Sequence, residues 1–294
     1  MADDEEDKIA QRLPELGLSS FAEPIFTYYS DGARAHAMRI ATNMARMRDY
    51  YQKRLGIQTR VALAVLNSND WSRLDASVAP YGMSFIRGTP PTVFMPAQGG
   101  MIFDGIVKGL KSFTPEQQAF LRERRMTFEA IAEIWADRIA AFHELGHIVL
   151  NDYGIDPRCL WLHEFLATYF GEEFTANEQG DWTITREFPK KPPSSSPPKR
   201  PKHTTLADFE KLYSRVDDYG WYQAQFLTQA QEVQSKLGLK FLKEVKRLFP
   251  ANSENSAAEG TPLTPEESLT RLEDISPGFK KWAEVFRENK PIEK

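Results

Sequence analysis

The sequence predicts an α+β fold that is rich in helices, with a small sheet region in its N-terminal part and a helical lobe at its C-terminal end. Short apolar runs typical of strands occur before residue 100, and the pattern is helical over most of the chain that follows. The 294 residues suffice to bury the core of one large domain or two modest ones. Apolar residues make up 41% and charged residues 27% of the chain, which excludes wholesale disorder, collagen-like repeats and disulfide scaffolds.

The N-terminal part contains the elements of the predicted sheet. A helix is expected over residues 33–55, which are rich in strong helix formers and are followed by Gly56 as a C-cap. Strands are expected over the apolar runs at 60–66 and 92–96. Between them, residues 80–91 have glycine and proline at turn-like intervals, which predicts a hairpin or an edge strand.

The rest of the chain is predicted to be mainly helical. Thr114, Pro115 and Gln117 form an N-cap, a first-turn proline and a capping-box partner, so a helix should begin there. By the same logic, Asp156 and Pro157 should begin a helix that ends near Glu173. Further helices are expected at 128–150, at 206–249 with a break near Gly238, and as short segments that start at Pro265 and Pro277.

Composition also predicts the domain boundaries. Residues 1–8 form an acidic terminus that is expected to be disordered. Residues 9–188 are assigned to the N-terminal α/β region together with the predicted metal-binding helices. Residues 189–203 read PKKPPSSSPPKRPKH, a linker or loop insertion, because prolines lack a backbone donor and the serines and lysines favour water. Residues 204–294 form the C-terminal helical lobe.

A metal site is indicated by His143-Glu144-Leu145-Gly146-His147, which is the HExxH pattern within the helix expected at 128–150. Residues four apart lie on one face of a helix, so both imidazoles can reach a single ion. Glu144 is rotated by about 100° from His143 and leans toward a metal-bound water. This arrangement predicts a hydrolytic zinc centre with one zinc ion per chain.

Such a centre usually has three protein ligands and one open position. If the two helices pack antiparallel about the turn at 151–156, Glu164 lies level with His143. Its neighbours on that helical face are small or apolar, so an ionised carboxylate there needs a cation. Glu164 is therefore the predicted third ligand. The alternatives are His163, Asp152, Asp156, Glu172 and Glu173.

The HELGH pattern, followed by WLHEFLATYF at 161–170, resembles the gluzincin metallopeptidases, and most closely the thermolysin-like catalytic domain of the M1-type aminopeptidases. The resemblance implies a thermolysin-like zincin fold with His143, His147 and Glu164 as zinc ligands and Glu144 as general base. It also implies a downstream tyrosine that stabilises the oxyanion, for which Tyr219 is preferred to Tyr222. The family's Gly-x-Met-Glu-Asn strand has no counterpart with a carboxylate at residues 81–85, so endopeptidase and aminopeptidase activities both remain open.

We therefore expect a zinc metallopeptidase that hydrolyses peptide or protein substrates. The alternative is an inactive zinc-containing interaction protein that binds partners through its Pro/Lys-rich linker and its helices. A formal charge of −4 gives no reason to expect a nucleic acid as ligand. The acidic start MADDEED is unlike a secretory signal and no apolar run is long enough for a membrane span, so a cytoplasmic location is expected. The single cysteine excludes an intramolecular disulfide, and the sequence leaves the oligomeric state open.

Overall fold

The computed structural model describes residues 9–74, 78–109, 113–189, 201–213, 219–251 and 262–286. The chain divides into a first unit, Met1–Val149 with Phe174–Pro192, and a second unit, Leu150–Glu173 with Pro193–Lys294. Residues 150–173 thus belong with the C-terminal part, whereas the sequence grouped them with the N-terminal region. The predicted acidic terminus and residues 190–200 of the predicted linker lie outside the described residues.

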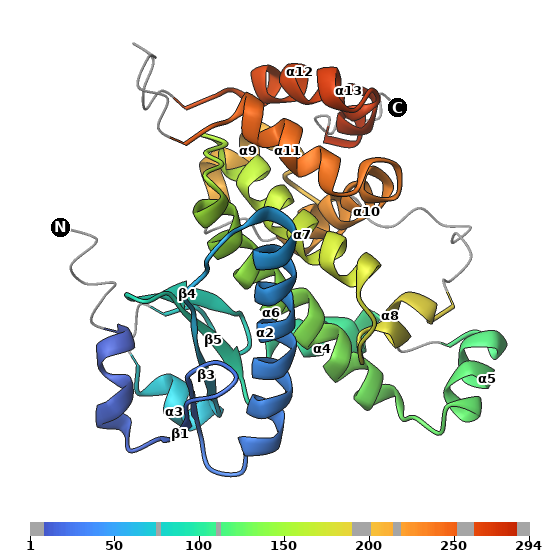
Figure 1. Cartoon of the computed structure of the whole chain (residues 1–294). Helices are drawn as coiled ribbons and strands as arrows, with labels where there is room; N and C mark the ends of the chain where they lie inside the picture. Colours follow the sequence, from blue (N-terminus) through green and yellow to red (C-terminus); the bar gives the residue numbers. More distant parts are fainter. Residues whose placement is uncertain are drawn as a thin grey trace. The chain divides into compact units, whose positions relative to one another are not determined.

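The first unit contains a five-stranded mixed sheet in the order β1-β2-β3-β5-β4 (Figure 1). The three inner strands are parallel, and β1 and β4 run antiparallel to their neighbours at the two edges. The strands are β1 Ser19–Phe21, β2 Thr27–Tyr29, β3 Ala62–Leu66, β4 Phe85–Arg87 and β5 Thr92–Pro96. The helix-rich α+β class, the two apolar strands and the edge strand are confirmed. The sequence missed β1 and β2, since three residues are too few to establish an alternating pattern.

Both faces of this sheet are covered by apolar packing. The connection between the parallel strands β2 and β3 is α2 (Arg34–Leu55), which packs against both of them. On β3, Ala64 and Leu66 belong to a core cluster with α3 (Ser68–Ser72) and the 3-10 helix η1 (Leu13–Leu16). Because successive strand residues point to opposite faces of a sheet, Leu63 and Val65 lie on the face opposite to Ala64 and Leu66. All five residues of β3 are buried, as expected for a central strand.

Four further helices follow the sheet in the first unit or begin there. They are α4 Met101–Gly109, α5 Pro115–Glu123, α6 Phe128–Tyr153 and α8 Thr183–Glu187. The predicted capping box of α5 is present, with Thr114 and Gln117 bonded reciprocally. The long helix α6 begins at Phe128 as predicted and carries the HExxH pattern, and its last turn belongs to the second unit.

Within its described residues, the second unit is helical around an aromatic core. Its elements are the first part of α7 (Leu160–Asn177), α9 Leu206–Leu212, α10 Tyr219–Leu237, α11 Leu239–Leu248, α12 Pro265–Ile275, α13 Phe279–Trp282 and the 3-10 helix η3 Ala283–Phe286. The α7 side chains Trp161, Phe165 and Tyr169 are fully buried, and Phe165 contacts the rings of Phe241 and Phe279. The predicted helix break is at Gly238 (φ 50°), between α10 and α11. The described helices include no membrane-spanning segment, because each is too short or too polar to cross a bilayer.

The predicted start of α7 at Asp156 is wrong, because the helix begins at Leu160. Asp156 instead accepts a hydrogen bond from the backbone N–H of Arg158, whose left-handed conformation (φ 54°) is incompatible with a helix. The first two backbone N–H groups of α7 donate hydrogen bonds to the carboxylate of Glu210. The distances are 3.0 Å from Leu160 N and 2.8 Å from Trp161 N. A side chain distant in sequence therefore performs the capping that the sequence assigned to a local residue.

Candidate metal centre

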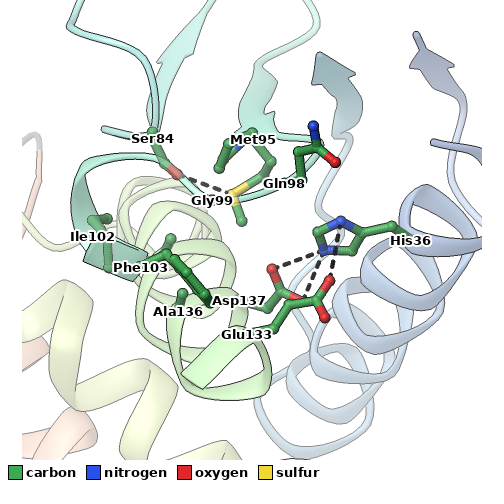
Figure 2. Close-up of a pocket in the computed structure, with 13 residues that line it drawn as sticks. His36, Ser84, Met95, Gln98, Gly99, Ile102, Phe103, Glu133, Ala136 and Asp137 are labelled. Atoms are coloured by element: carbon green, nitrogen blue, oxygen red, sulfur yellow. Dashed lines mark hydrogen bonds and ion pairs between the residues drawn. The ribbon is translucent and has the colours of Figure 1, made fainter. Parts of the chain in front are cut away.

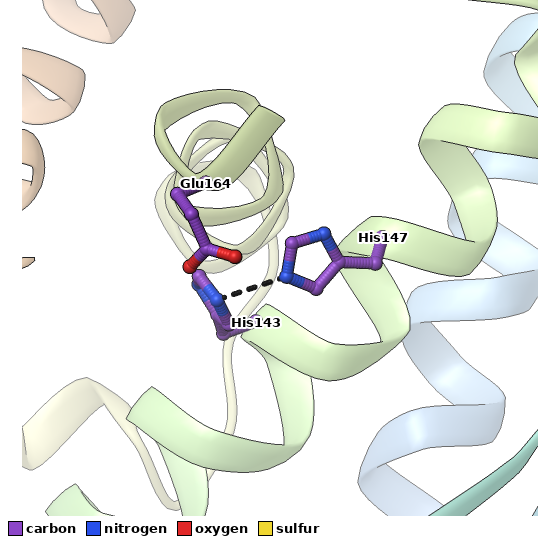
Figure 3. A group of neighbouring side chains, drawn as sticks. All are labelled: His143, His147 and Glu164. Atoms are coloured by element: carbon purple, nitrogen blue, oxygen red, sulfur yellow. Dashed lines mark hydrogen bonds between the residues drawn. The ribbon is translucent and has the colours of Figure 1, made fainter. Parts of the chain in front are cut away.

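Helix α6 presents His143 and His147 on one face. Their Nε2 atoms are 3.1 Å apart, and the two rings are almost perpendicular, with centroids separated by 4.7 Å (Figure 3). Both side chains are half-buried. The geometry follows from the spacing of four residues, which brings side chains together on successive turns.

Glu164 on α7 is a buried carboxylate, with 3% of the residue exposed. It accepts three side-chain hydrogen bonds within the second unit. Tyr213 donates to Oε1 at 2.6 Å, whereas Tyr219 and Gln223 donate to Oε2 at 2.6 and 2.7 Å. Hydrogen bonds of this kind compensate part of the cost of keeping a carboxylate away from water.

The three predicted ligands form a group that can bind a metal ion. One ring nitrogen of each histidine and one carboxylate oxygen of Glu164 lie within 4.8 Å of one another (Figure 3). It is the single such group of three or more residues in the described parts of the chain. The alternative third ligands belong to no group of this kind there.

The donor set fits zinc. Two imidazoles and one carboxylate are the protein ligands of a common class of hydrolytic zinc site. Two nitrogen ligands of a tetrahedral zinc ion, each about 2.0–2.1 Å from the metal, are separated by roughly 3.3 Å. The observed separation of 3.1 Å between the two Nε2 atoms is close to this value. Glu144 follows His143 directly and is half-buried on the same helix.

The two predicted tyrosines have different environments. The hydroxyl of Tyr219 donates to Glu164, whereas the fully buried Tyr222 donates to the backbone carbonyl of Thr205 at 2.8 Å. Sequence reasoning missed Tyr213 and Gln223. Gln223 lies four residues after Tyr219 on α10, so helical spacing could have identified it. Tyr213 lies outside α10, and no local pattern marks it.

A small pocket of about 20 Å³ lies in the first unit (Figure 2). Ala136 and Ala140 of α6 line it, and Ala140 precedes Glu144 by one turn, so the pocket follows the helical face that carries the HExxH residues. The remaining walls come from the end of β5, the loop after it, α4 and the segment just before β4. They include Ser84, Met95, Gln98, Gly99, Ile102 and Phe103.

His36 forms the polar end of this pocket. Its Nδ1 lies 2.7 Å from the carbonyl oxygen of Ala97, and its Nε2 lies 3.0 Å from the carboxylate of Asp137 (Figure 2). Both partners only accept hydrogen bonds, so this geometry favours the doubly protonated ring. Burial alone would lower the pKa of His36, but the hydrogen bond and charge of Asp137, together with the Ala97 carbonyl, raise it above its ordinary value.

No family model matches this chain, and no curated protein or solved structure was found to be similar to it. The resemblance to the gluzincin peptidases therefore depends on the sequence motifs at 143–147 and 161–170. The chemistry of the site follows from its donor atoms and their spacing.

Proposed function

We propose that the protein is a zinc-dependent metallopeptidase of the gluzincin type with a thermolysin-like fold. The observation that carries this proposal is the convergence of His143, His147 and Glu164 donor atoms within 4.8 Å, with Glu144 next to the first histidine. A zinc ion held there would polarise the scissile carbonyl and lower the pKa of a water molecule to about 7.

The chain's own residues supply the proton transfers and the stabilisation of charge. Glu144 removes a proton from the attacking water and then delivers it to the leaving amine, because its helical position places it beside His143. Tyr219 redirects its hydroxyl proton from the carboxylate of Glu164 to the developing oxyanion. Tyr219 is preferred to Tyr222 for this role because the Tyr219 hydroxyl lies 2.6 Å from the carboxylate of Glu164, the proposed third ligand. The hydroxyl of Tyr222 instead donates to a backbone carbonyl.

The sheet offers a place for an extended peptide. Strand β4 pairs with β5 on one side and has no second partner among the described strands. A strand edge of this kind can accept a peptide through backbone hydrogen bonds. The pocket beside Ala140 is lined partly by Ser84, which directly precedes β4, so the pocket adjoins the start of this strand.

The proposal is tested with Glu144→Gln in the full chain. Purified wild-type protein should contain about one zinc ion and cleave a mixed peptide library. The variant should retain the zinc while cleavage falls by about 10²- to 10⁴-fold, since the general base is lost. The control is Glu129→Gln, which changes an exposed glutamate at the start of α6 and should alter neither property.

The absence of zinc from the wild-type protein would overturn the metal site. Bound zinc without any cleavage by the wild type would favour the alternative of an inactive interaction protein. Comparison of peptides with free and blocked amino termini then separates an aminopeptidase, which requires the free amine, from an endopeptidase.

A further inference from the structure

Helices α7 and α10 are joined by three hydrogen bonds between a glutamine and a buried glutamate. Gln223 donates to Glu164 at 2.7 Å, and Gln231 and Gln234 donate to Glu172 and Glu173, each at 3.1 Å. The partners are separated by 59, 59 and 61 residues, so the two helices run parallel with nearly constant offset. Only the first pair of this ladder involves a predicted zinc ligand.

Gln223 is also the one glutamine of the ladder whose amide bonds a candidate catalytic group. Its Nε2 donates to Oε2 of Glu164 and to the hydroxyl of Tyr219, both at 2.7 Å. The orientation of the amide is fixed by chemistry, because a carboxylate accepts hydrogen bonds and only the NH₂ group can donate them. Its Oε1 faces away and accepts a long hydrogen bond of 3.4 Å from Thr168, which lies one turn after Glu164 on α7.

Tyr219 donates its hydroxyl proton to Oε2 of Glu164, and the amide of Gln223 donates both to the phenol oxygen and to the same carboxylate oxygen. Two donors on one carboxylate oxygen restrict rotation of the carboxylate about its bond to the side chain. We propose that Gln223 is a positioning residue that orients Glu164 for zinc and Tyr219 for the substrate, an inference that rests on the proposed function.

Loss of the amide should weaken zinc binding without disrupting the fold. Groups that orient a metal ligand through hydrogen bonds typically contribute 10- to 100-fold to metal affinity. The substitution Gln223→Met keeps a side chain of similar length and removes both N–H donors. The matched control is Gln231→Met, which removes the same kind of hydrogen bond two turns further along α10, at a glutamate outside the metal group.

The experiment measures the zinc affinity of the full-length wild type and both variants by competition with a chromogenic chelator. Thermal unfolding of the metal-free proteins is measured in parallel. We expect Gln223→Met to bind zinc 10- to 100-fold more weakly than the wild type. Gln231→Met should keep wild-type affinity, and both variants should lose similar thermal stability.

Equal zinc affinity in Gln223→Met and the wild type would overturn the positioning role while leaving the proposed function intact. An equal loss of affinity in both variants would also overturn it, because the effect would then come from the packing of α7 on α10. A wild-type protein that binds no zinc would instead overturn the proposed function.

Discussion

The cap of α7 gives a quantitative prediction, because Glu210 performs the role that the sequence assigned to Asp156. The variant Glu210→Ala removes the acceptors of two backbone N–H groups, at 3.0 and 2.8 Å. A typical net contribution of about 1 kcal/mol for each hydrogen bond gives a loss of about 2 kcal/mol. Leu160 is exposed, so water can reach its freed N–H group, whereas Trp161 is fully buried, which makes about 2 kcal/mol the lower end of the expected loss.

The assay is the free energy of unfolding in urea, with Tm as a second measure. With an unfolding entropy of about 2.1 cal/mol/K per residue, a loss of about 2 kcal/mol corresponds to roughly 3 °C in Tm for a chain of 294 residues. Glu210→Gln should lie between the wild type and Glu210→Ala, since one amide oxygen can still accept a hydrogen bond. Asp156→Ala removes a single bond to Arg158 N and should cost about 1 kcal/mol or less. A larger loss for Asp156→Ala than for Glu210→Ala would refute the reasoning.

Three further predictions concern the candidate site and its surroundings. Tyr219→Phe, assayed at saturating zinc, should reduce kcat by about 10²- to 10³-fold in steady-state cleavage; an unchanged kcat would remove Tyr219 from the oxyanion role. Because the pKa of His36 is raised in the folded protein, its stabilisation should be complete below the unfolded pKa of about 6.5 and disappear as pH rises through the folded value. The unfolding free energies of wild type and His36→Gln should therefore differ more at pH 6 than at pH 9. Burial raises the pKa of Cys159 to about 11, so a thiol reagent at pH 8 should label the denatured protein and not the native one.

Local patterns in the sequence predicted the parts of the fold that depend on neighbouring residues. The capping box of α5, the start of α6, the buried strands β3 and β5 and the break at Gly238 all follow from composition or periodicity within one turn or one strand. The strands β1 and β2 were harder to predict. Both β1 and β2 are three residues long, and β-pairing with a distant partner rather than their own pattern makes them strands.

In the candidate site, too, the residues set by local spacing could be predicted and those brought in by long-range contacts could not. His143, Glu144 and His147 could be found because a spacing of four residues fixes their relation on any helix. Glu164 could be found because a short turn between two helices sets an approximate register. Gln223 and Tyr213 lie 59 and 49 residues from Glu164, and no local rule connects them to it.

The sequence alone determined a helix with two histidines and a glutamate on one side, together with a carboxylate able to join them, because helical geometry is a local property. Only the tertiary structure decided which side chains support that carboxylate and which one caps its helix. Hydrogen bonds between α7 and the helices α9 and α10 depend on how these helices pack, since each joins residues at least 49 positions apart. The helix packing therefore decides how firmly the ligand is held, whereas the HExxH spacing decides where a metal ion can be bound.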